Sequence, residues 1–319
     1  MRIWLKVQVF PVLFVWYGNL FIRATRAVSR IQEFSADRLA ASTIGAQAFA
    51  EGLRVIHRNH AAFGDYFHDE VLPAVHRGYQ PPLIEGFTRY LQSEEILNRL
   101  NRFVEKELAV VHIDPRDSHP PLAQRLAALE HLPAGKAGDH SPALFLLNKV
   151  PELETRMFSA WVPPGVQGLK PISWKETGQR VVIPAWERLC RQNDRSLRDV
   201  TLDSLLSTAA TLHNFAEKTN IWALGAPMDV ARDYAEGLLV AALGSALYRE
   251  GWQIDNGPGY LWMRRGGASI DPHRLIEEMR TPEFTEGKWH EMLKRFQLDP
   301  AISLAPTSLS GSVQTGRQE

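Results

Sequence analysis

The sequence contains a single cysteine, Cys190, among its 319 residues. An internal disulfide is therefore excluded, and so is a structural zinc site built from several thiolates. One thiol also cannot supply the dithiol pair of redox exchange chemistry. The composition is typical of a reducing compartment.

The sequence also lacks an excess of charge of either sign, because 36 Lys and Arg residues balance 36 Asp and Glu residues. No basic run with interleaved aromatic residues occurs along the chain. Proteins that bind nucleic acid usually carry a basic patch that attracts phosphates. Nucleic acid is therefore not expected as a partner.

Long apolar runs are scarce, and the one candidate lies at the amino terminus. The stretch from Val7 to Ile22 has no charge, and counting from Ile3 gives about 20 residues, roughly a bilayer span, with Lys6 inside it. The aromatic residues Trp16 and Tyr17 suit a membrane interface, and arginines 23, 26 and 30 follow, which places the bulk of the chain in the cytoplasm. The pattern predicts a membrane-associated segment over residues 1–26, as a transmembrane or membrane-surface helix. A buried core helix is the alternative, and the arginines disfavour a cleavable signal peptide.

The rest of the chain predicts a mostly α fold. Apolar residues recur at helical spacing over residues 27–61, and further helices are expected at 65–76, 94–108, 122–132, 184–194, 199–218, 228–250 and 286–297. The aromatic and glycine-rich stretch over residues 251–270 predicts a small β-hairpin. Shifts in composition predict a helical domain over 27–135, an α-rich accessory domain over 136–306 and a disordered tail over 307–319.

Two acidic residues in the stretch SRIQEFSADRLAA, Ser29 to Ala41, raise the first functional question. Glu33 and Asp37 lie one helical turn apart on a face otherwise lined by alanines. Buried carboxylates need a cation, a metal or hydrogen-bond donors. Taken alone, the pattern is that of a solvated helix face, on which the two carboxylates pair with Arg30 and Arg38.

The second segment that could contribute to a functional site is DSHPPLAQRLAAL, Asp117 to Leu129. His119 precedes a proline, which favours an extended backbone and places the imidazole at the start of the following helix. There it could donate a hydrogen bond to an anion or a polarised carbonyl, or simply cap the helix.

Together and in this order, the two segments resemble the carboxyl-terminal half of the catalytic domain of membrane-associated zinc metalloproteases, the gluzincin family of the HtpX heat-shock protease and the CAAX prenyl endopeptidases. The shared pattern is serine-arginine, a glutamate, alanine-aspartate four residues later, and a downstream histidine-proline-proline with an arginine in the next helix. The preceding hydrophobic segment and ALFLLNKVPELETRM, residues 143–157, also match, so the resemblance covers about residues 1–160.

The resemblance implies a role for each of four residues. Glu33 would be the third zinc ligand, and Asp37 would accept a hydrogen bond from a metal-bound histidine. His119 would stabilise the oxyanion that forms on the scissile carbonyl, and Arg125 would anchor its helix structurally. The complete enzyme would hydrolyse peptide bonds with a metal-activated water, and its substrate would be a peptide or protein.

The sequence lacks the His-Glu-x-x-His motif that supplies the other two zinc ligands and the catalytic glutamate of this family. We therefore expect no tight zinc binding and no hydrolase activity from this chain alone. Three explanations stay open: a truncated protease, with the motif encoded upstream, which we favour; half of a split enzyme; or a metal-free, membrane-anchored helical interaction or regulatory protein.

Other residues could in principle build a separate site. A self-contained metal site could use a set of imidazoles and carboxylates at His57, His60, His68, Asp69, Glu70 and His76. The glycines of NGPG and RRGGAS lack the spacing of a phosphate loop. For residues 165–306 the sequence predicts only an accessory domain for partner or substrate contacts.

Overall fold

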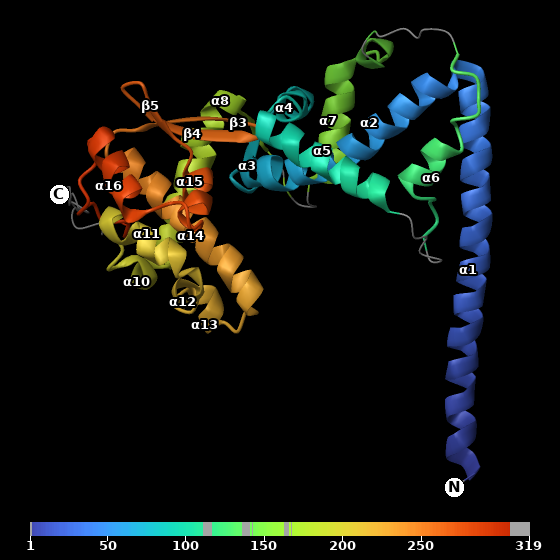
Figure 1. Ribbon diagram of the computed structural model, residues 1–319, viewed down its shortest axis with the longest axis horizontal. Coiled ribbons are helices and arrows are strands. Elements are labelled where there is room, and N and C mark those ends of the chain that lie inside the picture. The colour runs from blue at the N-terminus through green and yellow to red at the C-terminus, as the bar shows by residue number, and fades with distance from the viewer. Residues whose placement is uncertain are drawn as a thin grey trace, which may run out of the picture. The chain divides into compact units, whose positions relative to one another are not determined.

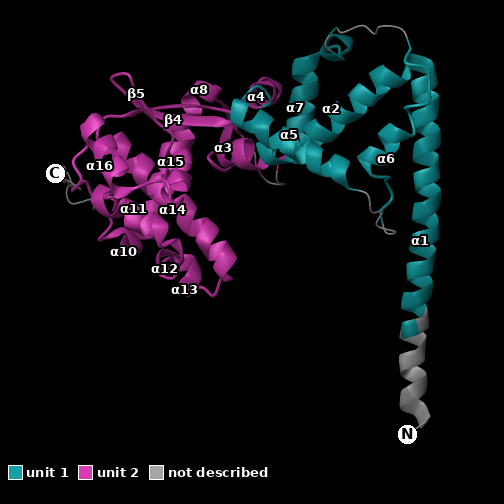
Figure 2. Cartoon of the chain, viewed as in Figure 1, with its two compact units in different colours: residues 1–67, 91–161 teal, residues 68–90, 162–319 magenta. Residues whose placement is uncertain are grey.

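A computed structural model describes the backbone of residues 2–110, 117–135, 141, 143–162, 166 and 168–306, and the side chains of these residues except those of 2–11 and 13. The predicted disordered tail over residues 307–319 lies outside the described residues. The chain divides into two compact units: residues 1–67 and 91–161 form unit 1, and residues 68–90 and 162–319 form unit 2 (Figure 2).

Unit 1 is helical (Figure 1). Its elements are α1 (Arg2–Ile44), α2 (Ala46–Asp65), α5 (Glu94–Ala109), α6 (Leu122–Ala127), the 3-10 turn η2 (Ala143–Leu146) and α7 (Val150–Trp161). The π-helical turn η1 (Tyr66–Val71) follows α2 directly. α1 includes both the apolar stretch at Val7–Ile22 and the first part of the helix predicted from residue 27, as one continuous helix.

The predicted single helix over residues 27–61 is interrupted at Gly45. Gly45 has φ 97°, and a Cβ atom there would lie 2.5 Å from the carbonyl oxygen of Ala134. The crossing loop also accepts a hydrogen bond at Pro133 O from the amide of Ala46, at 3.0 Å. The break therefore comes from a tertiary contact that only glycine permits, and it turns the chain between α1 and α2.

A small core joins α1, α2 and the α6 region. Its buried side chains are Ala41, Ala46, Leu53, Leu122, Leu126 and Leu129. The two alanines let the neighbouring backbones approach closely, while the leucines recur every three or four residues on one face of α6 and the turn after it. This packing fixes the segment after His119 against the helix that carries Glu33 and Asp37.

Unit 2 surrounds one central helix, α14 (Met228–Arg249). Residues 238–247 of this helix are all buried, and Gly244 lets the Trp186 ring pack directly on the backbone. The other helical elements are α3 (Leu72–His76), α4 (Leu83–Tyr90), α8 (Trp174–Thr177), η3 (Gly178–Val182), α9 (Ile183–Gln192), α10 (Asp194–Leu197), α11 (Leu202–Ala210), α12 (Leu212–Ala216), α13 (Asn220–Ala223), α15 (Pro272–Met279) and α16 (Glu286–Arg295).

The strands of unit 2 form two small sheets. β3 (Gln253–Gly257), β4 (Tyr260–Arg265) and β5 (Ala268–Ile270) make an antiparallel sheet in the order β3-β4-β5. β1 (Tyr79–Gln80) and β2 (Lys170–Pro171) pair in parallel. The mostly α fold class is confirmed, and the predicted hairpin carries a third strand because Gly266 and Gly267, both with positive φ, turn the chain once more.

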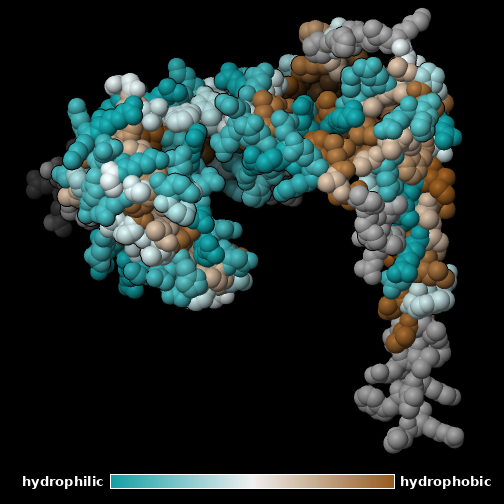
Figure 3. Space-filling model, in the orientation of Figure 1, coloured by the Kyte–Doolittle hydropathy of each residue, from teal (hydrophilic) through white to brown (hydrophobic). Residues whose placement is uncertain are grey.

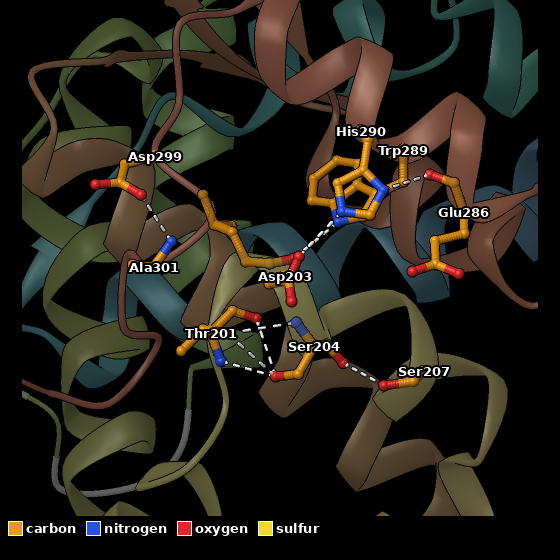
Figure 4. A network of polar contacts seen from close by, with 10 residues as sticks. Thr201, Asp203, Ser204, Ser207, Glu286, Trp289, His290, Asp299 and Ala301 are labelled. Atoms are coloured by element: carbon orange, nitrogen blue, oxygen red, sulfur yellow. Dashed lines mark hydrogen bonds and ion pairs between the residues drawn. The ribbon is translucent and has the colours of Figure 1, made fainter.

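A polar network ties the start of α11 to α16 (Figure 4). His290 Nε2 lies 3.0 Å from Asp203 Oδ1, and His290 Nδ1 lies 3.0 Å from the carbonyl oxygen of Glu286. The Trp289 indole nitrogen donates to the carbonyl oxygen of Leu202 at 2.7 Å. Thr201 and Ser204 form the capping box of α11 beside these contacts.

Among the described residues, no helix is long and apolar enough to cross a membrane. Within the predicted membrane segment over residues 1–26, the side chains of residues 1–11 and 13 lie outside the described set. The described part of α1 exposes apolar side chains on several sides, among them Phe14, Trp16, Tyr17, Leu20 and Phe21, each at least 50 % exposed (Figure 3).

Candidate functional site

The two acidic residues of the opening segment lie on the same side of α1 but differ in exposure. The Asp37 side chain is 4 % exposed, whereas the Glu33 side chain, one turn earlier, is 29 % exposed. Asp37 lies close to Ala41, which belongs to the core of unit 1. One carboxylate is therefore buried at the helix packing face, and the other lies at its edge.

The segment that carries His119 is held onto α1 by its own hydrogen bonds. The Arg30 guanidinium donates to the backbone carbonyl oxygen of Asp117 at 2.6 Å. The Asp117 carboxylate in turn accepts from the His119 amide at 3.0 Å. Pro120 and Pro121 follow, and α6 begins at Leu122 directly after them. Proline is tolerated there because the first amides of a helix need no partner within the helix.

The structure brings all four predicted site residues into one contact group, the Glu33 cluster, which comprises Glu33, Asp37, His119 and Arg125. His119 Nδ1 lies 3.1 Å from Glu33 Oε1. Arg125 donates to Asp37 twice, from Nε to Oδ2 at 2.8 Å and from Nη2 to Oδ1 at 2.6 Å. Arg125 Nη2 is also 3.3 Å from Glu33 Oε2. Residues 86 to 92 positions apart in the sequence thus meet on one face of α1.

The electrostatics of the cluster centre on Arg125. The hydrogen bond to Asp37 raises the pKa of Arg125, against the opposing effect of burial, and the Glu33 charge contributes in the same direction. Two carboxylates on one helix face are thereby compensated by a guanidinium that is itself 13 % exposed. The bidentate geometry is the strong form of an arginine-carboxylate contact.

Arg125 holds both oxygens of Asp37. His57 on α2 is a further neighbour that the sequence did not connect with these residues. Burial lowers the pKa of His57, and the nearby charges of Arg125 and His119 act in the same direction while Glu107 opposes them. The charges of Arg125 and His119 act on His57, so the packing of α2 brings this imidazole near the cluster.

The residues present do not fit a metal ion by themselves. Catalytic zinc needs three protein ligands, whereas Glu33 and His119 contact each other and Arg125 occupies the second Glu33 oxygen. Across the described part of the chain, no group of three His, Cys, Asp or Glu side chains is placed to hold a metal.

The self-contained site considered from sequence is not formed in the described residues either. His68 contacts Asp69 at 2.8 Å within unit 2, and Glu70 accepts a hydrogen bond from the Gly259 amide at 2.9 Å. His57 and His60 belong to unit 1. The six residues therefore do not converge on one point within either unit.

One family model, described as Peptidase family M48, matches residues 7–133. That span contains every residue of the Glu33 cluster. No curated protein and no solved structure matches the chain. The resemblance inferred from the two segments is thereby confirmed.

Proposed function

Because residues 7–133 belong to peptidase family M48, we propose that this chain is the part of a membrane-associated zinc metalloendopeptidase that carries the glutamate ligand and the substrate-side imidazole. The observation that carries the proposal is the 3.1 Å contact between Glu33 and His119, 86 positions apart. These are the two residues to which the family pattern assigns the metal and the scissile carbonyl.

Zinc belongs to the complete enzymes of the family, where it activates the attacking water. In this chain the described residues supply only one of the ligands that such an ion needs. We propose that the two histidines and the water-activating glutamate are supplied by another segment or by a second chain. The peptide or protein substrate is likewise part of the proposal, by membership of a peptidase family.

Each cluster residue has a defined task in this proposal. Arg125 fixes Asp37 and Glu33 on one side of α1, so that the Glu33 carboxylate stays at the edge of the core. His119 reaches the same carboxylate from the loop before α6, and its side chain is 66 % exposed. An imidazole that is both tethered and exposed can donate a hydrogen bond to a carbonyl oxygen of a bound peptide.

The second candidate function is a non-catalytic, membrane-anchored helical interaction or regulatory protein. One observation favours it: the side chains of the cluster contact one another, with Glu33 and Asp37 held by the Arg125 guanidinium and Glu33 also in contact with the His119 imidazole. Such a network stabilises the packing of α6 on α1 without a metal.

The first experiment is metal analysis of the purified chain and of the same chain together with the segment that supplies the histidines. DNA read upstream of Met1 should reveal an in-frame His-Glu-x-x-His, or a neighbouring gene should encode it. We expect no stoichiometric zinc in the chain alone and one zinc in the completed form. One tight zinc in the chain alone, lost on Glu33→Ala, would overturn the proposal.

The second experiment separates the two assigned roles in the completed form. Glu33→Ala should remove both zinc and peptidase activity. His119→Ala should retain zinc and lower kcat about 10²-fold, the usual loss for a removed oxyanion donor. Glu105→Ala, an exposed substitution on α5, is the control that should change neither. Equal loss of zinc in the Glu33 and His119 variants would contradict the roles of metal ligand and oxyanion donor. A completed form that binds a partner protein equally well without zinc would favour the interaction protein.

A further inference from the structure

Packing alone does not fix the imidazole of His119, because its side chain is 66 % exposed. Its ring contacts Glu33 Oε1 through Nδ1 at 3.1 Å. One contact at the end of an exposed side chain leaves the backbone free to move behind it, and each ordered residue costs conformational entropy. The position of the ring therefore depends on whatever holds the backbone of this segment.

Two hydrogen bonds, which we call the Arg30–Asp117 tether, hold that backbone. Arg30 Nη1 donates to the carbonyl oxygen of Asp117 at 2.6 Å, across 87 positions of the chain. Asp117 Oδ1 accepts from the amide of His119 at 3.0 Å, the pattern in which an aspartate side chain bonds the backbone two residues later. Pro120 follows and restricts the backbone of His119 further. The tether thus reaches from α1 to the residue that carries the imidazole.

The contacts on α1 follow the order of the downstream segment. Three residues about one turn apart on α1 contact three downstream residues in the same order: Arg30 with Asp117, Glu33 with His119, and Asp37 with Arg125. The first of these contacts involves no residue that is proposed as a metal ligand. The Arg30–Asp117 tether therefore holds the His119 backbone whatever else the Glu33 carboxylate binds.

We propose that Arg30 and Asp117 are positioning residues for His119. They hold its imidazole on the side of α1 that carries Glu33, and they act through His119 without touching the substrate. The catalytic consequence rests on the proposed function, in which this imidazole donates to the scissile carbonyl. Loss of the tether should lower kcat and leave KM nearly unchanged, because a displaced imidazole removes a contact made in the transition state.

The first test uses the full chain by itself and measures the ring position. Nuclear Overhauser contacts between the His119 ring and the Glu33 side chain should weaken in Arg30→Gln and in Asp117→Ala. Asp117→Asn should keep them, because the amide oxygen still accepts from the His119 amide. Arg38→Gln, at an exposed position about two turns later on α1, is the matched control and should change nothing. Unchanged contacts in both Arg30→Gln and Asp117→Ala would overturn the proposal.

The second test measures zinc content and peptidase kinetics in the completed form. Arg30→Gln and Asp117→Ala should each retain zinc and lower kcat about tenfold, the effect of losing one hydrogen bond that involves a charged group. Asp117→Asn should recover most of this loss. Full kcat in the Arg30 variant, or equal losses in Asp117→Asn and Asp117→Ala, would contradict a positioning role. A completed form without zinc or activity would refute the proposed function, whereas the nuclear Overhauser contacts still decide the tether, so the two failures are distinguishable.

Discussion

At the scale of single residues, Asp37 and Arg125 form the most deeply buried ion pair of the site, with side chains 4 % and 13 % exposed. Removal of one partner leaves a buried charge without compensation, which typically costs about 3–5 kcal/mol. Arg125→Ala should therefore lower the free energy of unfolding of unit 1 by about 3 kcal/mol. Urea unfolding followed by circular dichroism, with hydrogen exchange of α1 and α6 amides, measures the effect.

Arg102→Ala on the exposed face of α5 is the matched control and should stay within about 0.5 kcal/mol of the unchanged chain. The double variant Asp37→Asn with Arg125→Ala should lose less than the sum of the two single variants, because the pair is removed together. Strict additivity would mean that the two side chains are not coupled.

Glu70 carries a second residue-scale prediction. Burial raises the pKa of Glu70 to about 7, against the hydrogen bond from the Gly259 amide. The folded state therefore holds a proton between about pH 4.5 and pH 7 that the unfolded state has released. The stability of unit 2 should fall as the pH rises through this window, by about 1–2 kcal/mol for a partly exposed carboxyl group.

Glu70→Gln should remove this part of the pH dependence, because the amide stays neutral and its oxygen still accepts from Gly259. Unfolding by urea at pH values from 4.5 to 8 should show the variant gaining stability relative to the unchanged chain as the pH rises. Glu85→Gln, an exposed glutamate on α4 in the same unit, serves as the control. Parallel pH profiles for Glu70→Gln and the unchanged chain would contradict the prediction.

The sequence identified Glu33, Asp37, His119 and Arg125 as candidate site residues. It did not predict which of these side chains contact one another. Local spacing places Glu33 and Asp37 on one helix face, because that depends only on the helical repeat. The pairing of Asp37 with Arg125 crosses 88 positions and depends on how α6 docks on α1. The proximity of His57 to Arg125 and His119 depends on how α2 packs, so no local sequence pattern predicts it.

At the scale of elements, strain at Gly45 is expected to set the break between α1 and α2, and a glycine inside α2 offers the comparison. Gly45→Ala would force a Cβ atom to 2.5 Å from Ala134 O at a φ of 97°, where an L side chain is strained. We expect unit 1 to lose about 1–3 kcal/mol of stability. The measurement is the urea midpoint together with exchange protection of the α1–α2 junction.

Gly52→Ala is the matched control, because an added Cβ on α2 meets nothing within 4 Å. This substitution should stabilise the helix by about 0.5–1 kcal/mol through intrinsic propensity. Similar losses in both variants would mean that strain at Gly45 does not set the break.

His290 links α16 to α11 and gives the junction a pH dependence (Figure 4). The hydrogen bond to Asp203 raises the pKa of His290, and the Glu286 carbonyl acts in the same direction. Both ring nitrogens face acceptors, so the protonated ring satisfies both contacts. This stabilisation is fully present below the unfolded pKa of about 6.5 and is lost as the pH rises through the higher folded pKa.

Hydrogen exchange should therefore show faster opening of the first turn of α16 near pH 8 than near pH 6, after correction for the intrinsic rate. His290→Gln should abolish this difference, whereas His273→Gln, at an exposed position on α15, should preserve it. A His290 variant that retains the full pH dependence would exclude the imidazole as its source.

Helices with long periodic patterns were predicted well, while short and tertiary-determined features were not. The helix predicted over residues 228–250 is confirmed as α14, the buried centre of unit 2. The prediction of one unbroken helix over residues 27–61 was wrong. The helix breaks at Gly45 because a loop about 90 residues downstream packs against this glycine. The short α4 and α15 were not predicted, since each begins next to prolines that also signal loops.

At the scale of the whole molecule, the family match and the compact units do not share a boundary. The match over residues 7–133 includes residues 68–90, which belong to unit 2. The chain therefore leaves unit 1 and returns to it within the matched span. Unit 2 adds its own core around α14, so a substitution in one core should leave the other core folded.

The proposed membrane association depends on the exposed apolar residues of α1 between Val12 and Ile22. The described residues from Val12 to Ile22 are almost all apolar and exposed, and Arg23, Arg26 and Arg30 follow without an acidic residue before Glu33. Family M48 is generally membrane-associated. We expect the chain to bind vesicles that contain anionic lipid and to bind neutral vesicles more weakly, because each basic residue near the surface contributes about 1 kcal/mol.

Sedimentation with vesicles separates the apolar and charged contributions. Phe14→Ala with Phe21→Ala should lower partitioning more than tenfold, since burial of one phenylalanine is worth about 1.5–3 kcal/mol. Arg23→Gln with Arg26→Gln should weaken binding to anionic vesicles only and reduce its salt dependence. Leu224→Ala removes an equally exposed apolar side chain from unit 2 and should change nothing. If the Leu224 variant loses as much binding as the α1 variants, adhesion is nonspecific and the helix is not the anchor.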